Sequence, residues 1–246
     1  MISSKLSHPS NKGSLRRRFI TATVGIPALL LIVIAGPSWV LVLAVTATLL
    51  GLMEFFRLAN VQRFWFHKVP SLALGSLMIL LGWNNQTFII TTLAVATPLV
   101  LLLSYRMFQP SIRPPLLALI GPMYLGATLA HGPLLRRLDD GTSWLLLPIL
   151  ASFAVDTTAY FTGTLIGRHK IAPKLSPGKT WEGTVAGIAG GVIATTTLIP
   201  VLGLEVSFWA SAFLGTTIGV VAILGDLLES GIKRMAQMKD AGSIIP

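Results

Sequence analysis

Eight stretches of the chain are rich in apolar residues and nearly free of charged ones. A bilayer core about 30 Å thick needs about 20 mainly apolar residues in a helix. The apolar residues form continuous runs and do not alternate with polar ones, so the pattern predicts helices and not the strands of a β-barrel. We therefore expect an all-α fold, a polytopic transmembrane helix bundle with about eight spans. The runs are Phe19–Ala35, Trp39–Phe56, Val69–Trp83, Gln86–Ser104, Pro115–Gly132, Trp144–Gly167, Gly183–Gly203 and Ser207–Leu228.

The basic residues lie almost entirely in alternate connections between these runs. If the N-terminus is cytoplasmic, 17 of the 19 Lys and Arg fall in cytoplasmic segments, and only Arg136 and Arg137 fall outside. Lys and Arg accumulate in cytoplasmic loops, so the pattern favours eight spans with both ends inside. We divide the chain into a basic cytoplasmic N-terminal tail, residues 1–18, and a multi-pass membrane domain, residues 19–246, which would hold any functional site.

Composition and charge restrict the chemistry further. Hydrophobic residues make up 53% of the 246 residues and charged residues 11%, against roughly 25% charged in soluble domains. The net charge of +10 would suggest a nucleic-acid partner in a soluble chain. Here the charge is explained by the cytoplasmic loops, and we expect no nucleic acid but a lipid bilayer. The chain has no Cys, which excludes disulfides, thiolate metal sites and cysteine nucleophiles.

Three carboxylates lie within or at the edge of apolar runs, where ionisable groups are costly and therefore functional candidates. Asp156 lies in the sixth run and shares a helical stripe with Tyr160, Gly163 and Gly167. The alternative to a functional role is a structural one, in which Asp156 pairs with a polar group on another helix. Asp226 and Glu229 lie at the end of the eighth run. The alternative to a functional role is that both form ion pairs with neighbouring cations of the same helix.

Asp240 follows Asp226 by 14 residues and, in a continuous helix, would share its face with Lys233. At 1.5 Å per residue, however, the two carboxylates would lie about 21 Å apart, too far for a shared cation. We therefore expect the helix to break between them, at Gly231 or around Ala241–Gly242, unless the two carboxylates serve different centres.

The connection between the sixth and seventh runs combines cations, hydroxyl groups and turn-forming residues. Its Gly178-Lys179-Thr180 is not a P-loop, because position 173 is Pro where that motif requires Gly. Ser176, Lys179 and Thr180 precede a helix whose N-terminus favours anions, which predicts phosphate binding. In the runs that follow, glycines four residues apart (Gly183, Gly187, Gly191, Gly215 and Gly219) are better explained by close helix packing than by substrate binding.

Two segments carry a resemblance to a known family. Ser230–Pro246 reads SGIKRMAQMKDAGSIIP, and Ser176–Gly183 reads SPGKTWEG. Together with Asp156–Tyr160, they resemble the CDP-diacylglycerol synthase family, also called phosphatidate cytidylyltransferases. The first half of the chain matches this family only as a hydrophobic multi-span region. Gly178 stands where the family commonly has Lys. The family pattern also continues beyond the proline with further Gly, His and Asp residues, so we expect the chain to be cut short inside the signature.

The resemblance implies that CTP and phosphatidate react to CDP-diacylglycerol and pyrophosphate with the help of Mg²⁺. Asp226 and Asp240 are then the candidate metal ligands and, with Lys233, the candidate catalytic residues. The candidates for binding substrate phosphates, or for orienting the groups that bind them, are Ser176, Lys179, Thr180, Arg234, Lys239 and Asp156. We expect the protein in a bacterial inner membrane, and the sequence leaves a homodimer open.

Two alternatives remain at this point. One is an ion-coupled secondary transporter that uses Asp156 and Asp226 as proton or sodium sites. The other is an inactive truncated fragment. The transporter should show broken helices in paired halves, whereas the candidate residues of this chain cluster toward one end of the spans.

Overall fold

The computed structural model describes residues 12–58, 65–84, 86–107, 113–173 and 175–235. Within them, eight helices and a two-stranded hairpin follow one another, and each predicted apolar run coincides with one helix. This confirms the all-α helical bundle. The elements are α1 (Lys12–Ala35), α2 (Pro37–Leu58), α3 (Trp65–Trp83), α4 (Thr87–Met107), α5 (Arg113–Arg136), α6 (Gly141–Leu165), β1 (Lys170–Ala172), β2 (Ser176–Thr180), α7 (Trp181–Val201) and α8 (Phe208–Met235).

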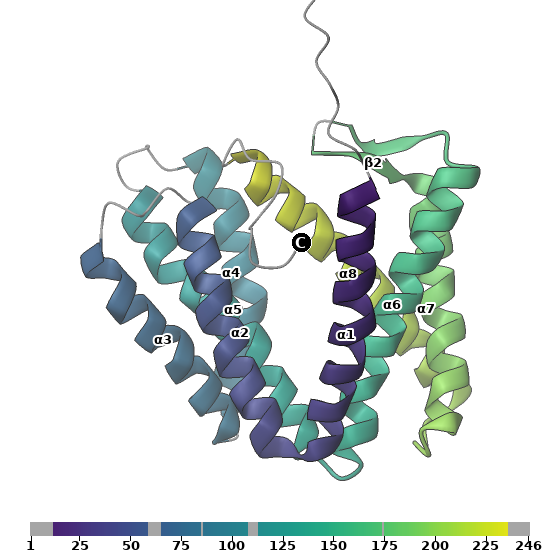
Figure 1. Cartoon of the computed structure of the whole chain (residues 1–246), viewed down its shortest axis with the longest axis horizontal. Coiled ribbons are helices and arrows are strands. Elements are labelled where there is room, and N and C mark those ends of the chain that lie inside the picture. The colour runs from purple at the N-terminus through teal and green to yellow at the C-terminus, as the bar shows by residue number, and fades with distance from the viewer. Residues whose placement is uncertain (1–11, 59–64, 85, 108–112, 174, 236–246) are drawn as a thin grey trace, which may run out of the picture.

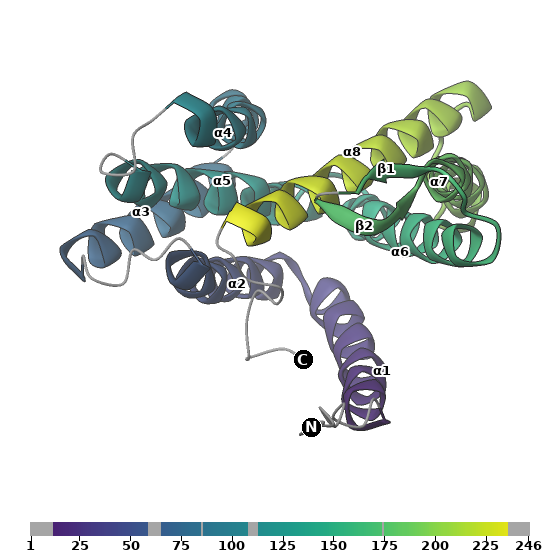
Figure 2. The same cartoon turned by 90° about the horizontal axis from the view of Figure 1, so that it is seen from above.

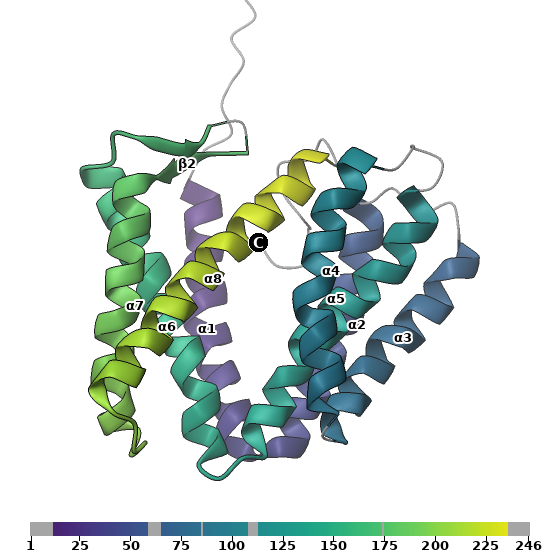
Figure 3. The same ribbon diagram turned by 180° about the vertical axis from the view of Figure 1, so that it is seen from behind.

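The helices run up and down through the molecule. Figures 1 and 3 show that α1, α3, α5 and α7 begin on the side of the hairpin, and that α2, α4, α6 and α8 end there. This alternation is the one that the distribution of basic residues predicts. At the opposite side, Arg136 ends α5 and Arg137 follows it in the connection to α6.

Four of the eight described helices are long and apolar enough to cross a membrane, so the predicted count of about eight spans is somewhat high. These stretches are Pro37–Arg57, Gly141–Leu165, Trp181–Val201 and Phe208–Gly231. Three other apolar stretches measure only 10–17 residues within the described part of the chain, Thr23–Ala35, Val69–Trp83 and Thr87–Thr97.

Two groups of helices pack around separate apolar centres. In the first group, α2 to α5 enclose a cluster that includes Ile79, Ile90 and Ala127. In the second group, α6 packs along α7 and α7 along α8, with Leu147 and Ile199 buried near the side opposite the hairpin. Figure 2 shows α8 passing obliquely from the second group toward the first. The end of α8 therefore lies between the two groups.

Glycines allow α6, α7 and α8 to approach closely. A Cβ atom on Gly187 would lie 3.0 Å from the Cβ of Ala159 on α6. A Cβ on Gly191 would lie 2.8 Å from the carbonyl oxygen of Gly215 on α8. These distances leave no room for a side chain, which confirms that the four-residue glycine spacing serves helix packing.

Two local features go beyond or differ from the expectations. The turn-forming connection between α6 and α7 contains an antiparallel hairpin that pairs Lys170 with Thr180 and Ala172 with Ser176. The helix that carries Asp226 does not break at Gly231, because α8 continues to Met235. In a helix, glycine is unfavourable but tolerated, and it ends the helix only when other signals accompany it. Ala241–Gly242 lies outside the described residues.

Candidate functional site

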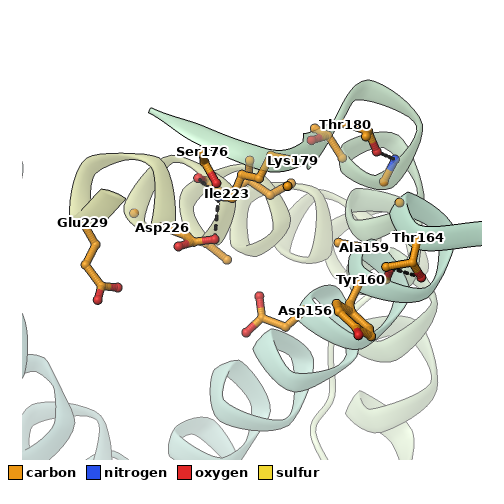
Figure 4. A pocket seen from close by; sticks show the side chains of 16 residues that line it. Asp156, Ala159, Tyr160, Thr164, Ser176, Lys179, Thr180, Ile223, Asp226 and Glu229 are labelled. Atoms are coloured by element: carbon orange, nitrogen blue, oxygen red, sulfur yellow. Dashed lines mark hydrogen bonds and ion pairs between the residues drawn. The ribbon is translucent and has the colours of Figure 1, made fainter. Parts of the chain in front are cut away.

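A cavity of about 690 Å³ lies at the hairpin side of the second helix group. Four elements enclose it: α6, β2, the first turn of α7, and α8 (Figure 4). Its volume falls within the range of small-molecule pockets. The lining residues are Asp156, Ala159, Tyr160, Gly163, Thr164, Ser176, Gly178, Lys179, Thr180, Gly183, Thr184, Ala222, Ile223, Gly225, Asp226 and Glu229.

The wall formed by α6 is the stripe predicted from helical spacing. Asp156, Tyr160 and Gly163 all line the cavity. Gly167, the fourth predicted member, lies beyond the C-terminus of α6, and a Cβ atom there would lie 2.7 Å from Thr180 Oγ1. The stripe thus combines a polar wall with a close contact to the hairpin.

Lys179 and Asp226 join the hairpin to α8 across the cavity. Lys179 Nζ lies 2.7 Å from Asp226 Oδ2 and also donates a hydrogen bond of 3.1 Å to the carbonyl oxygen of Ile223. The Lys179 side chain is 18% exposed and that of Asp226 57%. Long-range folding thus pairs two residues that are 47 positions apart and were both candidates from the sequence.

Thr180 fixes the start of α7. It is the N-cap residue: its side-chain oxygen accepts a hydrogen bond of 3.1 Å from the backbone N–H of Gly183, and the residue is 2% exposed. A Cβ atom on Gly163 would lie 3.1 Å from this oxygen. Thr180 lines the cavity, but its hydroxyl oxygen supports the helix start, the usual function of an N-cap threonine.

His169 and Glu182 hold the base of the hairpin, and neither residue was among the candidates that the sequence predicted. Glu182 Oε1 lies 2.7 Å from His169 Nδ1, and the Glu182 carboxylate also accepts from the His169 backbone N–H at 3.2 and 3.3 Å. The backbone N–H of Trp181 donates to the carbonyl oxygen of His169 at 2.9 Å. The available signal was an acidic residue in the first turn of a helix, where it is favoured by the helix dipole.

The remaining candidates are placed only in part. Ser176 lines the cavity from β2. Arg234 Nε donates a hydrogen bond of 3.2 Å to the carbonyl oxygen of Leu175, which ties the end of α8 to the hairpin. Lys233 lies in α8, but its side chain is outside the described part of the structure. Lys239 and Asp240 also lie outside the described residues.

Three carboxylates border the same open space. Figure 4 shows Asp156 on α6 and Asp226 and Glu229 on α8, all directed toward it. Within the described residues, no three His, Asp or Glu side chains are close enough to hold a metal on their own. Mg²⁺ is usually bound by one or two carboxylates together with waters and substrate phosphates. The donor set therefore fits a cation that arrives with a phosphorylated substrate.

The fold is a helical membrane bundle, and its site combines cations, hydroxyl groups and carboxylates at one edge. These are the groups that a nucleotidyltransferase requires. Residues 16–246 match the model of the cytidylyltransferase family, and the chain belongs to this family. Similar proteins named phosphatidate cytidylyltransferase occur in Staphylococcus saprophyticus and Staphylococcus haemolyticus. Each is 28% identical to this chain over 239 residues, which cover 93% of the chain and 89% of the relative. A third, from Staphylococcus epidermidis, is 28% identical over 236 residues.

Proposed function

We propose that this protein is a phosphatidate cytidylyltransferase, which converts CTP and phosphatidate to CDP-diacylglycerol and pyrophosphate. The observation that carries the proposal is the Lys179–Asp226 pair in a cavity between membrane helices and a water-facing hairpin. One substrate is a lipid and the other is a soluble nucleotide, so a site that receives both belongs at this boundary. The names of the three relatives support the same reaction.

In this reaction, a phosphate oxygen of phosphatidate forms a bond to the α-phosphorus of CTP. The bond from that phosphorus to the oxygen bridging to the β-phosphate breaks, and pyrophosphate leaves. Both reactants are anions, so positioning and charge neutralisation dominate catalysis. Lys179 supplies positive charge from β2, and Arg234 supplies it from α8. The Ser176 hydroxyl can donate a hydrogen bond to a phosphate oxygen from the hairpin side.

Asp226 is the residue that we propose to hold Mg²⁺, because its side chain borders the cavity and is more than half exposed. Bound Mg²⁺ would neutralise charge that develops on the phosphate oxygens. Asp156 and Glu229 face the same space and can orient Lys179 or metal-bound water. Asp240 and Lys239 keep their predicted roles as a second ligand and a phosphate-binding cation.

We also propose that the hairpin side is cytoplasmic and that the membrane is a bacterial inner membrane. CTP is made in the cytoplasm, and most Lys and Arg residues belong to segments on that side. The two exceptions are held at helix ends on the opposite side. Arg136 Nε donates to the Val33 carbonyl oxygen at 2.9 Å, and the Arg137 guanidinium lies 4.8 Å from the centre of the Trp83 ring. A homodimer stays a prediction.

The transporter alternative gains no support from the helices that carry the two aspartates. Transporter sites of this kind form where membrane helices are interrupted. α6 runs continuously through Asp156, and α8 runs continuously through Asp226. We therefore assign both carboxylates to the proposed transferase site.

The test is conversion of phosphatidate by the purified protein in the presence of CTP and Mg²⁺, measured as CDP-diacylglycerol formed. Asp226→Asn should abolish turnover at every Mg²⁺ concentration, because it removes the proposed ligand charge. Glu205→Gln is the matched control, since Glu205 is exposed in the α7–α8 connection on the opposite side. Activity of the 246-residue chain would exclude the inactive fragment. A folded wild type that makes no product, or an Asp226→Asn variant with normal turnover, would contradict the proposal.

A further inference from the structure

Gly225 in α8 has no structural reason to be glycine. Among the described glycines, a Cβ atom would meet nothing within 4 Å at Gly25, Gly36, Gly178, Gly203 and Gly225. Gly36 and Gly203 are explained by their backbone, since their φ angles are +128° and +71°. Gly225 and Gly25 have neither a positive φ nor a close neighbour, but of these two only Gly225 lines the cavity. Glycine inside a helix is unfavourable relative to alanine, so this position calls for another explanation.

Two other glycines of α8 are explained by close helix packing. A Cβ atom on Gly215, also in α8, would lie 2.6 Å from the carbonyl oxygen of Gly191. A Cβ on Gly219 would lie 2.9 Å from the Cα of Ile188. Both positions need glycine because α7 lies against them. Helix packing therefore accounts for the glycines in the middle of α8 but not for Gly225.

Gly225 instead faces the cavity, directly before Asp226 in the chain. It belongs to the apolar stretch Phe208–Gly231, and the facing residues Asp156 and Ala159 belong to the apolar stretch Gly141–Leu165. This is the membrane side of the cavity. The hairpin closes the other side with Ser176 and Gly178, which lie outside both stretches.

We propose that Gly225 leaves the space through which the glycerol-phosphate end of a diacyl phospholipid reaches Asp226. The inference rests on the proposed function and adds a position that determines which lipid can enter. A soluble nucleotide approaches from the hairpin, whereas a lipid enters from the bilayer between α6 and α8. A side chain at position 225 therefore obstructs the lipid and leaves nucleotide binding intact.

The experiment compares Gly225→Ala and Gly225→Leu with the wild type in detergent or nanodiscs. The KM for phosphatidate should rise with the size of the added side chain and reach about tenfold or more for leucine. One extra methylene in a fitted pocket already has an effect of that size. The KM for CTP should stay unchanged. Because alanine and leucine favour helices, the thermal midpoint should stay equal or rise.

Two matched controls separate obstruction from general effects. Gly231→Ala changes the same helix at a position outside the cavity, where the nearest atom to an added Cβ, Leu175 Cδ2, lies 4.0 Å away. Gly25→Leu places the larger side chain in equally open space on α1. Both variants should keep the wild-type KM for phosphatidate. The inference is wrong if Gly225→Leu leaves that KM unchanged, or if the KM for CTP rises instead.

A binding measurement keeps this test independent of turnover. Wild-type protein in nanodiscs should bind added phosphatidate in preference to phosphatidylcholine, and Gly225→Leu should lose that preference by about tenfold, in line with the KM. If the wild type binds phosphatidate but makes no CDP-diacylglycerol, the proposed function fails and the lipid entry site stands. If both proteins bind phosphatidate equally, the entry site fails whatever the activity is.

Discussion

Replacement of Lys179 by methionine separates the catalytic from the structural contribution of the hairpin. Methionine keeps the length and apolar stem of lysine but removes the charge and the donors. The variant therefore loses the 2.7 Å pair with Asp226 and the 3.1 Å hydrogen bond to the Ile223 carbonyl oxygen. The rest of the hairpin, including the N-cap at Thr180, is unchanged.

The expected loss of stability is small. Two unit charges 2.7 Å apart attract by about 6 kcal/mol at an effective dielectric constant of 20. Desolvation, side-chain entropy and solvent screening offset most of this attraction, and exposed pairs contribute about 0–1 kcal/mol. Asp226 is 57% exposed and Lys179 18%, so we expect a net loss of about 1–2 kcal/mol. For a chain of this size, that corresponds to a few degrees in the thermal midpoint.

The expected loss of activity is larger. Removal of one positioned group that stabilises transition-state charge lowers kcat by about 10²–10³. This corresponds to roughly 3–4 kcal/mol, so catalysis should suffer more than stability. The assay is CDP-diacylglycerol formation at saturating CTP and phosphatidate, with the thermal midpoint measured on the same preparation.

Lys170→Met is the matched control, because Lys170 is an exposed lysine on β1 that does not line the cavity. It should keep wild-type activity within about threefold, the scatter expected of surface substitutions within about 0.5 kcal/mol. A Lys179→Met enzyme with nearly normal kcat would refute the reasoning. So would a thermal midpoint so low that loss of folded protein accounts for the lost activity.

Three further predictions concern the framework of the site. Thr180→Val removes the N-cap acceptor and should lower stability by about 1 kcal/mol in thermal unfolding, while Thr180→Ser should restore it; equal midpoints would contradict the cap. Gly215→Val should destabilise by about 1–3 kcal/mol or prevent folding, because its Cβ would lie 2.6 Å from the Gly191 carbonyl oxygen; a normal midpoint would show that α7 and α8 are less tightly packed. Glu182→Ala should loosen the hairpin by removing the contacts to His169 and should lower kcat/KM more than Glu182→Gln does, since glutamine keeps an acceptor; equal kinetics in the two variants would contradict this role.

The helices could be predicted from the sequence because lipid imposes a simple length and polarity requirement. Every apolar run became a helix, since a backbone in lipid must satisfy its hydrogen bonds within the segment. The number of spans was harder to predict. α5 carries Pro122 and Pro133 and begins and ends with Arg, and within the residues described with their side chains it is not among the stretches long and apolar enough to cross a membrane. Apolar character alone does not distinguish a full crossing from a helix buried against its neighbours.

The sequence predicted which residues belong to the site, but not which of them contact one another. Lys179 and Asp226 were candidates separately, Asp226 because a carboxylate at the edge of an apolar run is costly, and Lys179 because it lies with hydroxyl groups in a turn-forming connection before a helix N-terminus. Their contact depends on how far the hairpin folds back over α8, which no periodicity encodes. The contact between His169 and Glu182 could not be predicted for the same reason, since the hairpin must form before the two side chains can meet.

The sequence by itself determined the helices, their alternating direction and the polar and charged residues that are candidates for the site. Those properties follow from local hydrophobicity and charge, which each segment carries wherever it lies. Only the tertiary structure decided that α6, α8 and the hairpin enclose one cavity, and that Gly225 faces it without packing against anything. These features depend on contacts between segments that are distant in the sequence. The energy of such a contact depends on both residues of the pair, so neither position reveals it alone.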